Sequence, residues 1–471
     1  MKKHRTRWRT LVPLLVFPIS ALSAHVIKVP EDQSTIQLAI TAAEDGDTVL
    51  VDPGIYKENI IFRGKKIVVT SRFFVAGDSS IVASTIIDGS SPLQPDSGSV
   101  VRFVNHEDST AILQGFTLRG GIGTKWTDEH GAGVYREGGG ILVEGCSPTI
   151  RCNVIANNAV SVGGGVVSAG GGGIRAGDGN PHILNNLISG NTGRYGAGVV
   201  LNFCDAVIRN NIITENRGGE DYGGGALWIN HPGATTKLIE NNTIAGNVAS
   251  GGGIYVWFGS PAAVRSCIIW GNTSPQVSVR TGTALTITYS DVQGLTSGTG
   301  NFSIDPGFSD ASFHLSDTSK CIDAGDTSAS ALDPASLADP ALALWPSMGT
   351  SRDDIGAYGG PGRAGFPPLS GATSVQNRPL RTVPEDFSLK QNFPNPFNPS
   401  TTIRYTLSRA THVTLSVYSL LGALVSTLVQ AEQGAGEHEV HFDGGGLSSG
   451  VYFYRLSAGG QMQSKSLLLL K

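Results

Sequence analysis

The chain of 471 residues is long enough for two or three domains or for one long array of repeats. Its 63 glycines and its low content of charged residues, 15%, are typical of a β-rich extracellular protein. The 34 Lys and Arg residues against 38 Asp and Glu residues give a net charge of −4, and no basic block follows the N-terminus, which argues against a nucleic-acid partner.

The N-terminus has the pattern of a Sec export signal. A basic stretch over residues 2–9 precedes an apolar stretch over residues 11–22, and the small residues Ser23 and Ala24 offer a cleavage site. The apolar stretch is too short to span a bilayer and contains two prolines, so a cleaved signal is preferred to a retained anchor. We therefore predict a signal peptide over residues 1–24 and no membrane span in the mature chain.

Residues 25–50 predict a cap in front of a repeat array. Residues 34–37 form a capping-box pattern, and apolar residues at helical spacing over 36–43 indicate a helix of about three turns. The sequence from residue 36 to residue 60, IQLAITAAEDGDTVLVDPGIYKENI, resembles the opening of the pectin-lyase-like superfamily of right-handed parallel β-helix proteins. The resemblance implies a helix that covers the first coil of an all-β solenoid.

One sequence unit recurs along residues 112–275. Each copy reads Gly-x-Gly-apolar, a polar turn, an apolar residue and then Asn-apolar-Ile-x-x-Asn. The copies cover residues 138–158, 171–191, 196–216, 223–247 and 251–272. Such repetition indicates a solenoid whose coils pair in parallel and bury rows of Ile, Val and Leu. With the resemblance above, it predicts a right-handed parallel β-helix over residues 25–360.

Asparagine columns fix the register of the repeats. The first column is Asn153, Asn186, Asn211 and Asn242, with Cys267 in the last copy, and the second is Asn158, Asn191, Asn216, Asn247 and Asn272. Asparagine tolerates left-handed backbone, and its amide can hydrogen-bond to the coils above and below. We therefore predict that both columns are structural. The 5 cysteines are odd in number and widely spaced, so buried free thiols are expected, with a Cys146–Cys152 bridge as the alternative.

Residues 276–360 are predicted to form terminal coils, with 329–348 as a surface insertion. Their Asp- and Gly-rich motifs resemble the ending of many secreted β-helix proteins. We interpret Asp323, Asp326 and Asp354 as residues that hold turns, with a calcium site as the alternative.

Residues 361–385 are rich in Pro, Gly and Ser and are typical of a linker. Residues 386–471 then alternate between apolar and polar positions and predict a small β-sandwich. Strands are expected at residues 401–407, 413–418, 424–428, 436–442 and 450–456.

This C-terminal segment carries the motifs QNFPNPFNPSTTI at 391–403, VYSLLG at 417–422 and LSSGVYFYR at 447–455. The motifs resemble the type A C-terminal sorting domain of the type IX (Por) secretion system. The resemblance implies Sec export followed by passage through the outer membrane, with the type IX machinery as a partner of residues 386–471. The protein would then reside on the outer-membrane surface or in the extracellular medium.

The repeat is interrupted along one edge of the solenoid. Residues 121–137 are an insertion, and later loops at the same register carry more aromatic and charged residues. The carbohydrate-binding candidates on these loops are Trp126, Tyr135, Arg194, Tyr195 and Tyr222. Aromatic rings stack on sugar C–H surfaces, and charged groups bind hydroxyls or carboxylates. Solvated variable loops are the alternative.

The outward face of the strands after each glycine pair is a second candidate surface. If Ile141, Ile174, Val199 and Ile254 point inward, alternation turns Arg175, Tyr255, Trp257, Glu144 and Asn202 outward. An exposed Tyr255–Trp257 pair would form a sugar platform, or it would pack beneath a loop.

Catalytic candidates are confined to one dense polar cluster. Its members are Lys125, Asp128, Glu129, His130 and Arg136, which a polysaccharide lyase or a glycoside hydrolase would use. The repeats contain no compact Asp pair and no acidic column. No metal site and no cofactor are predicted, apart from calcium if the protein is a lyase.

The preferred interpretation is a monomeric surface β-helix protein that binds polysaccharide or extracellular matrix through the loop edge. The missing acidic constellation favours it over a lyase or hydrolase. An architectural or adhesive protein without a small ligand is the third alternative.

Overall fold

The computed structural model describes residues 24–363 and 388–469, apart from short gaps. The gaps are residues 77, 129, 220–222, 233–236, 259–261, 274, 281–283, 329, 337–338, 393, 396, 408–410, 420–423, 434–435 and 459–460. Residues 1–23 of the predicted signal peptide and residues 364–385 of the predicted linker therefore lie outside the described residues, as do the candidates Glu129 and Tyr222.

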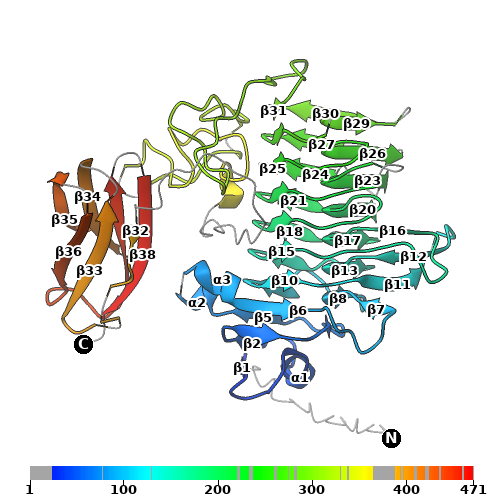
Figure 1. The fold of residues 1–471 in the computed structure, drawn as a ribbon, viewed down its shortest axis with the longest axis horizontal. Coiled ribbons are helices and arrows are strands. Elements are labelled where there is room, and N and C mark those ends of the chain that lie inside the picture. Colours follow the sequence, from blue (N-terminus) through cyan, green and yellow to red (C-terminus); the bar gives the residue numbers. More distant parts are fainter. Residues whose placement is uncertain are drawn as a thin grey trace, which may run out of the picture.

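Three long parallel sheets wind into a β-helix, and successive coils stack along its axis (Figure 1). Sheet A contains β1 (Val26–Val29), β2 (Thr48–Val51), β5 (Val68–Ser71), β9 (Ile112–Gln114), β14 (Thr149–Arg151), β18 (His182–Leu184), β21 (Val207–Arg209), β24 (Lys237–Glu240), β27 (Ala262–Arg265) and β30 (Leu285–Thr288). Sheet B contains β3 (Gly54–Tyr56), β6 (Thr85–Asp88), β10 (Thr117–Arg119), β15 (Val154–Ala156), β19 (Leu187–Ser189), β22 (Ile212–Thr214), β25 (Thr243–Ala245), β28 (Ile268–Trp270) and β31 (Asp291–Val292). Sheet C contains β4 (Ile60–Ile61), β8 (Val101–Phe103), β13 (Ile141–Glu144), β17 (Ile174–Gly177), β20 (Val199–Cys204), β23 (Leu227–Pro232), β26 (Ile254–Phe258) and β29 (Val277–Val279). The predicted parallel β-helix is confirmed.

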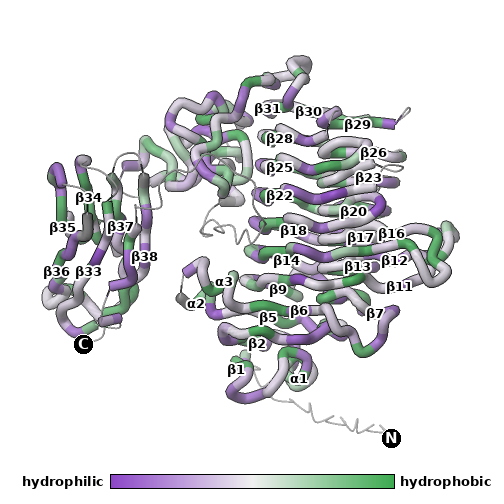
Figure 2. The backbone as a smooth tube through the Cα atoms, viewed as in Figure 1, coloured by the Kyte–Doolittle hydropathy of each residue, from purple (hydrophilic) through white to green (hydrophobic). Residues whose placement is uncertain are grey.

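Each sheet contributes a row of aliphatic side chains to one continuous core. In sheet B, for example, the fully buried row is Ile155, Ile188, Ile213, Ile244 and Ile269. Hydrophobic segments accordingly recur at equivalent places in successive coils (Figure 2). Burying an isoleucine stabilises a fold by about 1.5–3 kcal/mol, so the stacked rows are the main force that holds the coils together.

Both asparagine columns form the hydrogen-bonded ladders that the sequence predicted. In the second column, Asn158 donates from Nδ2 to Asn191 Oδ1 at 3.0 Å, and Asn191 donates in the same way to Asn216 at 3.0 Å. The ladder ends where Asn272 Nδ2 donates to Gln276 Oε1 at 2.9 Å. All five cysteines are free and buried, as expected, and Cys267 takes the asparagine position in the last coil of the first column.

A short helix, α1 (Ile36–Ala42), lies at the N-terminal end of the β-helix. It is shorter than the predicted three turns, because the backbone is already extended at Ala43. The residue that caps it is Thr35, whose hydroxyl accepts a hydrogen bond from Leu38 N at 3.1 Å. Two further short helices, α2 (Phe73–Ala76) and α3 (Ser80–Ser84), precede β6.

After β31 the chain returns along the turns between sheets A and B. Asn210 Nδ2 donates to the carbonyl oxygen of Ala357 at 3.0 Å, and Asn241 Nδ2 donates to Asp353 Oδ1 at 2.7 Å. Asp354 accepts hydrogen bonds from the backbone N–H groups of Asp323 and Met348, both at 2.7 Å. Carboxylates in this segment therefore tie turns together, up to the short helix η1 (Pro361–Arg363).

The C-terminal segment forms a small β-sandwich of antiparallel sheets. One sheet contains β32 (Ser388–Leu389), β33 (Ser400–Leu407) and β36 (Gly436–Asp443), and the other contains β34 (Thr411–Ser419), β35 (Leu424–Gln433), β37 (Gly450–Ala458) and β38 (Gln461–Leu469). Their inner faces bury a separate hydrophobic core, which includes Leu415 and Tyr454. Strands β32 and β38 were not among the predicted strands. No helix in the described part of the chain is long and apolar enough to cross a membrane.

Candidate functional site

The insertion at residues 121–137 is an antiparallel hairpin, and the prediction of a loop was wrong. Its strands β11 (Gly123–Thr127) and β12 (Val134–Glu137) pair so that Trp126 lies opposite Tyr135. The hairpin gains further partners in β7 (Ser97–Gly98) and β16 (Ser168–Gly170), which complete a four-stranded sheet D. Sheet D projects beside sheet C (Figure 1) and forms a wall along one side of it.

Sheet C supplies a floor next to this wall. Along each strand, side chains alternate between the core and the outer face of the sheet. Paired positions on successive strands lie side by side, so the outward side chains form rows across the coils. One row contains Leu142, Arg175, Val200, Trp228 and Tyr255. The adjacent row contains Glu144, Gly177, Asn202 and Asn230, and Asn230 Nδ2 donates to Asn202 Oδ1 at 2.8 Å.

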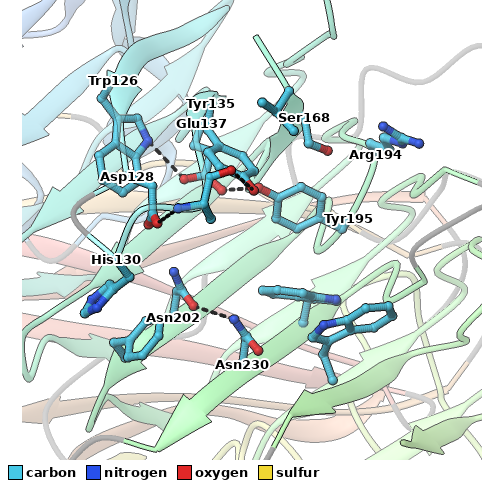
Figure 3. A pocket seen from close by; sticks show the side chains of 15 residues that line it. Trp126, Asp128, His130, Tyr135, Glu137, Ser168, Arg194, Tyr195, Asn202 and Asn230 are labelled. Carbon is cyan, nitrogen blue, oxygen red and sulfur yellow. Dashed lines mark hydrogen bonds between the residues drawn. The ribbon is translucent and has the colours of Figure 1, made fainter.

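Wall and floor enclose a cleft of about 380 Å³ (Figure 3). Its lining residues are Trp126, Asp128, His130, Ala132, Tyr135, Glu137, Val167, Ser168, Arg194, Tyr195, Asn202, Phe203, Trp228, Asn230 and Trp257. Aromatic rings continue from one coil to the next, since Tyr195 and Trp228 have centroids 4.9 Å apart and Trp228 stacks on Trp257 at 6.3 Å. The cleft therefore combines an aromatic surface with several polar groups.

A buried ionic network joins the floor to the wall. Arg175 is fully buried and pairs with both Glu137, at 3.1 Å, and Glu144. Its guanidinium also lies over the Trp126 ring, 4.2 Å from the centroid. Space for this side chain depends on Gly177, because a Cβ there would lie 2.2 Å from Arg175 Nη1. A buried arginine flanked in this way holds the hairpin against sheet C.

The Glu137 carboxylate accepts hydrogen bonds from two side chains that line the cleft. Trp126 Nε1 donates to its Oε2 at 3.0 Å, and the Tyr195 hydroxyl donates to its Oε1 (Figure 3). Burial raises the pKa of the Glu137 carboxyl, although Arg175 opposes that shift. Burial and the adjacent carboxylate also raise the pKa of the Tyr195 phenol well above its usual value.

Asp128 and His130 lie at one end of the cleft (Figure 3). Asp128 is 6% exposed and accepts a hydrogen bond from Ala132 N at 2.9 Å, which closes the tip of the hairpin. His130 stacks on Phe203 with centroids 3.6 Å apart, and its Nε2 lies 3.0 Å from Asp178 Oδ1. Both side chains are therefore held by the protein itself.

Most of the sequence-predicted candidates meet at this cleft, although two separate surfaces were considered. Those on its lining are Trp126, Asp128, His130, Tyr135, Arg194, Tyr195, Asn202 and Trp257. Tyr255 packs edge-on against Trp257, 5.6 Å between centroids, and is not part of the lining.

Two cationic candidates on the hairpin point elsewhere. Lys125 Nζ donates to the carbonyl oxygen of Gly164 at 2.8 Å, and Arg136 pairs with Asp96 at 2.8 Å. Alternation along the strands explains this, because Trp126, Tyr135 and Glu137 take the cleft side.

The sequence reasoning missed Trp228, Asn230 and Glu137. Aligning Leu227 with the inward residues of the other copies would have revealed the first two, because strand alternation then turns them outward next to Tyr255. Glu137 had no comparable signal, since it directly precedes the repeated glycines and belongs to no motif.

Two polar atoms on the lining have no hydrogen-bond partner among the described residues. They are Trp228 Nε1, on a side chain only 9% exposed, and Asn230 Oδ1. Buried polar atoms in folded proteins are almost always paired with protein, water or ligand. No group of three His, Cys, Asp or Glu side chains within the described ranges is placed to hold a metal ion.

The C-terminal motif has a structural role inside the β-sandwich. Asn392 N donates to the Tyr454 hydroxyl at 2.8 Å, and Asn392 Nδ2 donates to Thr401 Oγ1 at 2.9 Å. The motif thus fixes the entry of the chain into β33.

Comparison with known proteins identifies this domain. Residues 391–470 match the family described as secretion system C-terminal sorting domain. They are a type IX sorting domain. The sorting domain indicates export to the cell surface or the extracellular medium, as predicted. The match does not extend to the β-helix, and no curated protein matches the chain.

Proposed function

We propose that this exported protein binds polysaccharide, on a cell surface or in the extracellular matrix, through the cleft between sheets C and D. The observation that carries the proposal is the run of aromatic rings Tyr195, Trp228 and Trp257. Beside it, Trp228 Nε1 and Asn230 Oδ1 have no hydrogen-bond partner within the described part of the chain. Aromatic faces bind the C–H surfaces of sugars, and an adjacent donor and acceptor match sugar hydroxyls. Trp228, Asn230 and Trp257 lie on the neighbouring strands β23 and β26, and Tyr195 packs against Trp228. These groups are therefore held in place before a ligand arrives.

A glycoside hydrolase is the second candidate, on one specific observation. Asp128 and Glu137 line the same cleft, and burial raises the pKa of Glu137, as is usual for a general acid. Glu137 nevertheless already accepts hydrogen bonds at both oxygens, which limits its ability to protonate a leaving group. A lyase has less support, because Lys125 and Arg136 pair away from the cleft. Binding without turnover is therefore the preferred function.

A glycan array probed with the full-length protein, with and without calcium, tests the proposal. Trp257→Ala should abolish binding because it removes one end of the aromatic surface. Phe258→Ala is the matched control, since Phe258 is 49% exposed on the same strand and does not line the cleft. Depolymerisation of a bound glycan that is lost in Asp128→Ala would instead establish an enzyme. Absence of binding on every glycan would leave the architectural or adhesive alternative.

A further inference from the structure

The charges around the cleft indicate which class of sugar it accepts. A glycan is neutral unless it carries uronate, sulfate or amine groups, so these charges discriminate between neutral and charged sugars. An inference from these charges rests on the proposed glycan binding and narrows the class of sugar that the cleft binds.

The positive charge on the floor of the cleft is already neutralised. Arg175 is 0% exposed and pairs with Glu137 and Glu144, and its Nη1 donates to the carbonyl oxygen of Val143 at 3.2 Å. The face of its guanidinium lies against Trp126. Because its side chain is fully buried and does not belong to the lining, this arginine is not presented to an acidic sugar in the cleft.

At one end of the cleft, the remaining charged groups on the lining disfavour anions. Asp128 and Glu137 are 6% and 4% exposed, and their carboxyl groups lie on the same side of the cleft (Figure 3). His130, at that end, already lies 3.0 Å from the carboxylate of Asp178. The other charged group, Arg194, lies at the opposite end (Figure 3). An anionic sugar at this end would thus meet the carboxylate of Asp128, whereas the charge of Glu137 is already offset by Arg175. In a partly dehydrated site like charges repel more strongly than in water.

The two lining atoms that have no hydrogen-bond partner among the described residues, by contrast, belong to neutral groups. Trp228 Nε1 is a donor and Asn230 Oδ1 is an acceptor, and both belong to β23 on the floor. Adjacent hydroxyls of a neutral sugar can accept from the first and donate to the second. A carboxylate placed against these two atoms could only accept, so it would leave Asn230 Oδ1 without a partner.

We infer that the cleft is selective for uncharged saccharides and excludes polyuronates. Selectivity of this kind has two sources. An acidic ligand is repelled by the negative charge on the lining, and it loses hydrogen bonds that a neutral ligand of the same shape keeps. The expected discrimination between a neutral oligosaccharide and an oligogalacturonate is on the order of 100-fold in Kd.

Calorimetric titration of the full-length protein tests the inference. The probes are neutral xylo-, manno-, gluco- and galacto-oligosaccharides, with oligogalacturonate of matched length as the acidic probe. Support requires that a neutral probe binds, that its Kd is the same in low and high salt, and that oligogalacturonate binds on the order of 100-fold more weakly. Tight oligogalacturonate binding that is lost in Trp257→Ala would overturn the inference and leave the proposed function standing. Failure of every probe would overturn both.

A charge-only substitution adds an independent readout. Asp128→Asn keeps the oxygen that accepts from Ala132 N and removes one negative charge from the lining. The substitution should lower the ratio of the oligogalacturonate Kd to the neutral-oligosaccharide Kd by about tenfold. Asp317→Asn is the matched control, since Asp317 is exposed and lies outside the cleft, and it should leave the ratio unchanged. A ratio that responds equally to both substitutions would contradict the inference.

Discussion

Substituting Asn216 by alanine should weaken the β-helix locally and strongly. The side chain is fully buried, and its Oδ1 accepts from Asn191 N at 3.1 Å and from Asn191 Nδ2 at 3.0 Å. Its Nδ2 donates to the carbonyl oxygen of Ile188 at 2.9 Å. Alanine would leave the N–H of Asn191 and the carbonyl of Ile188 unpaired inside the solenoid. At about 1–3 kcal/mol for each buried unpaired group, the expected cost is about 2–6 kcal/mol.

Hydrogen exchange measured by mass spectrometry is the appropriate assay, because a repeat array need not unfold in one cooperative step. Peptides that contain Asn191 should lose protection by at least tenfold, since each 1.4 kcal/mol changes an equilibrium constant tenfold. Asn180→Ala is the control, because Asn180 is exposed and its side chain should contribute within ±0.5 kcal/mol. Equal protection in the two variants would refute a structural role for the asparagine ladders.

Three further outcomes are expected. Arg175→Met should lower the free energy of opening of the hairpin, measured by hydrogen exchange, by about 3–5 kcal/mol, because its two glutamate partners would be left buried without a cation. A loss below about 1 kcal/mol would contradict a stabilising role for this ion-pair network. Burial raises the pKa of Asp353 to about 6, of Asp354 to about 7 and of Asp333 to about 9. The folded state therefore holds these protons more tightly than the unfolded chain, so the stability they contribute is complete below about pH 4 and is lost as pH rises towards 9. Hydrogen exchange of the terminal segment should be faster at pH 8 than at pH 5 after correction for intrinsic rates, and Asp333→Asn should reduce the difference. Deletion of residues 391–470 should keep the protein from the cell surface and medium, as cell fractionation would reveal.

The β-helix was predictable from the sequence because its information is local and repeated. Each coil must bury the same aliphatic row and satisfy the same turn, so positions such as Asn191 and Ile188 recur in every copy. The sorting domain was predictable for a different reason, since its motif residues, including Asn392, make the hydrogen bonds that define the entry to the β-sandwich.

The cleft was predictable only in part, because it is assembled across coils. The insertion at 121–137 was identified as a break in the repeat, but its folding into a hairpin depends on pairing with β7 and β16 from other coils. Arg175 was placed outward correctly, yet its complete burial follows from the hairpin above it. Local alternation gives the direction of a side chain, whereas its environment depends on which distant segments cover it.

A crystal structure with a bound neutral oligosaccharide would show whether the cleft is the binding site. We expect the saccharide to lie in the cleft between sheets C and D, with a ring over Trp228 or Trp257. Its hydroxyls should lie within hydrogen-bond distance of Trp228 Nε1 and Asn230 Oδ1. A saccharide bound on another face of the β-helix, or on the sorting domain, with the cleft left empty, would contradict the proposed function of the cleft.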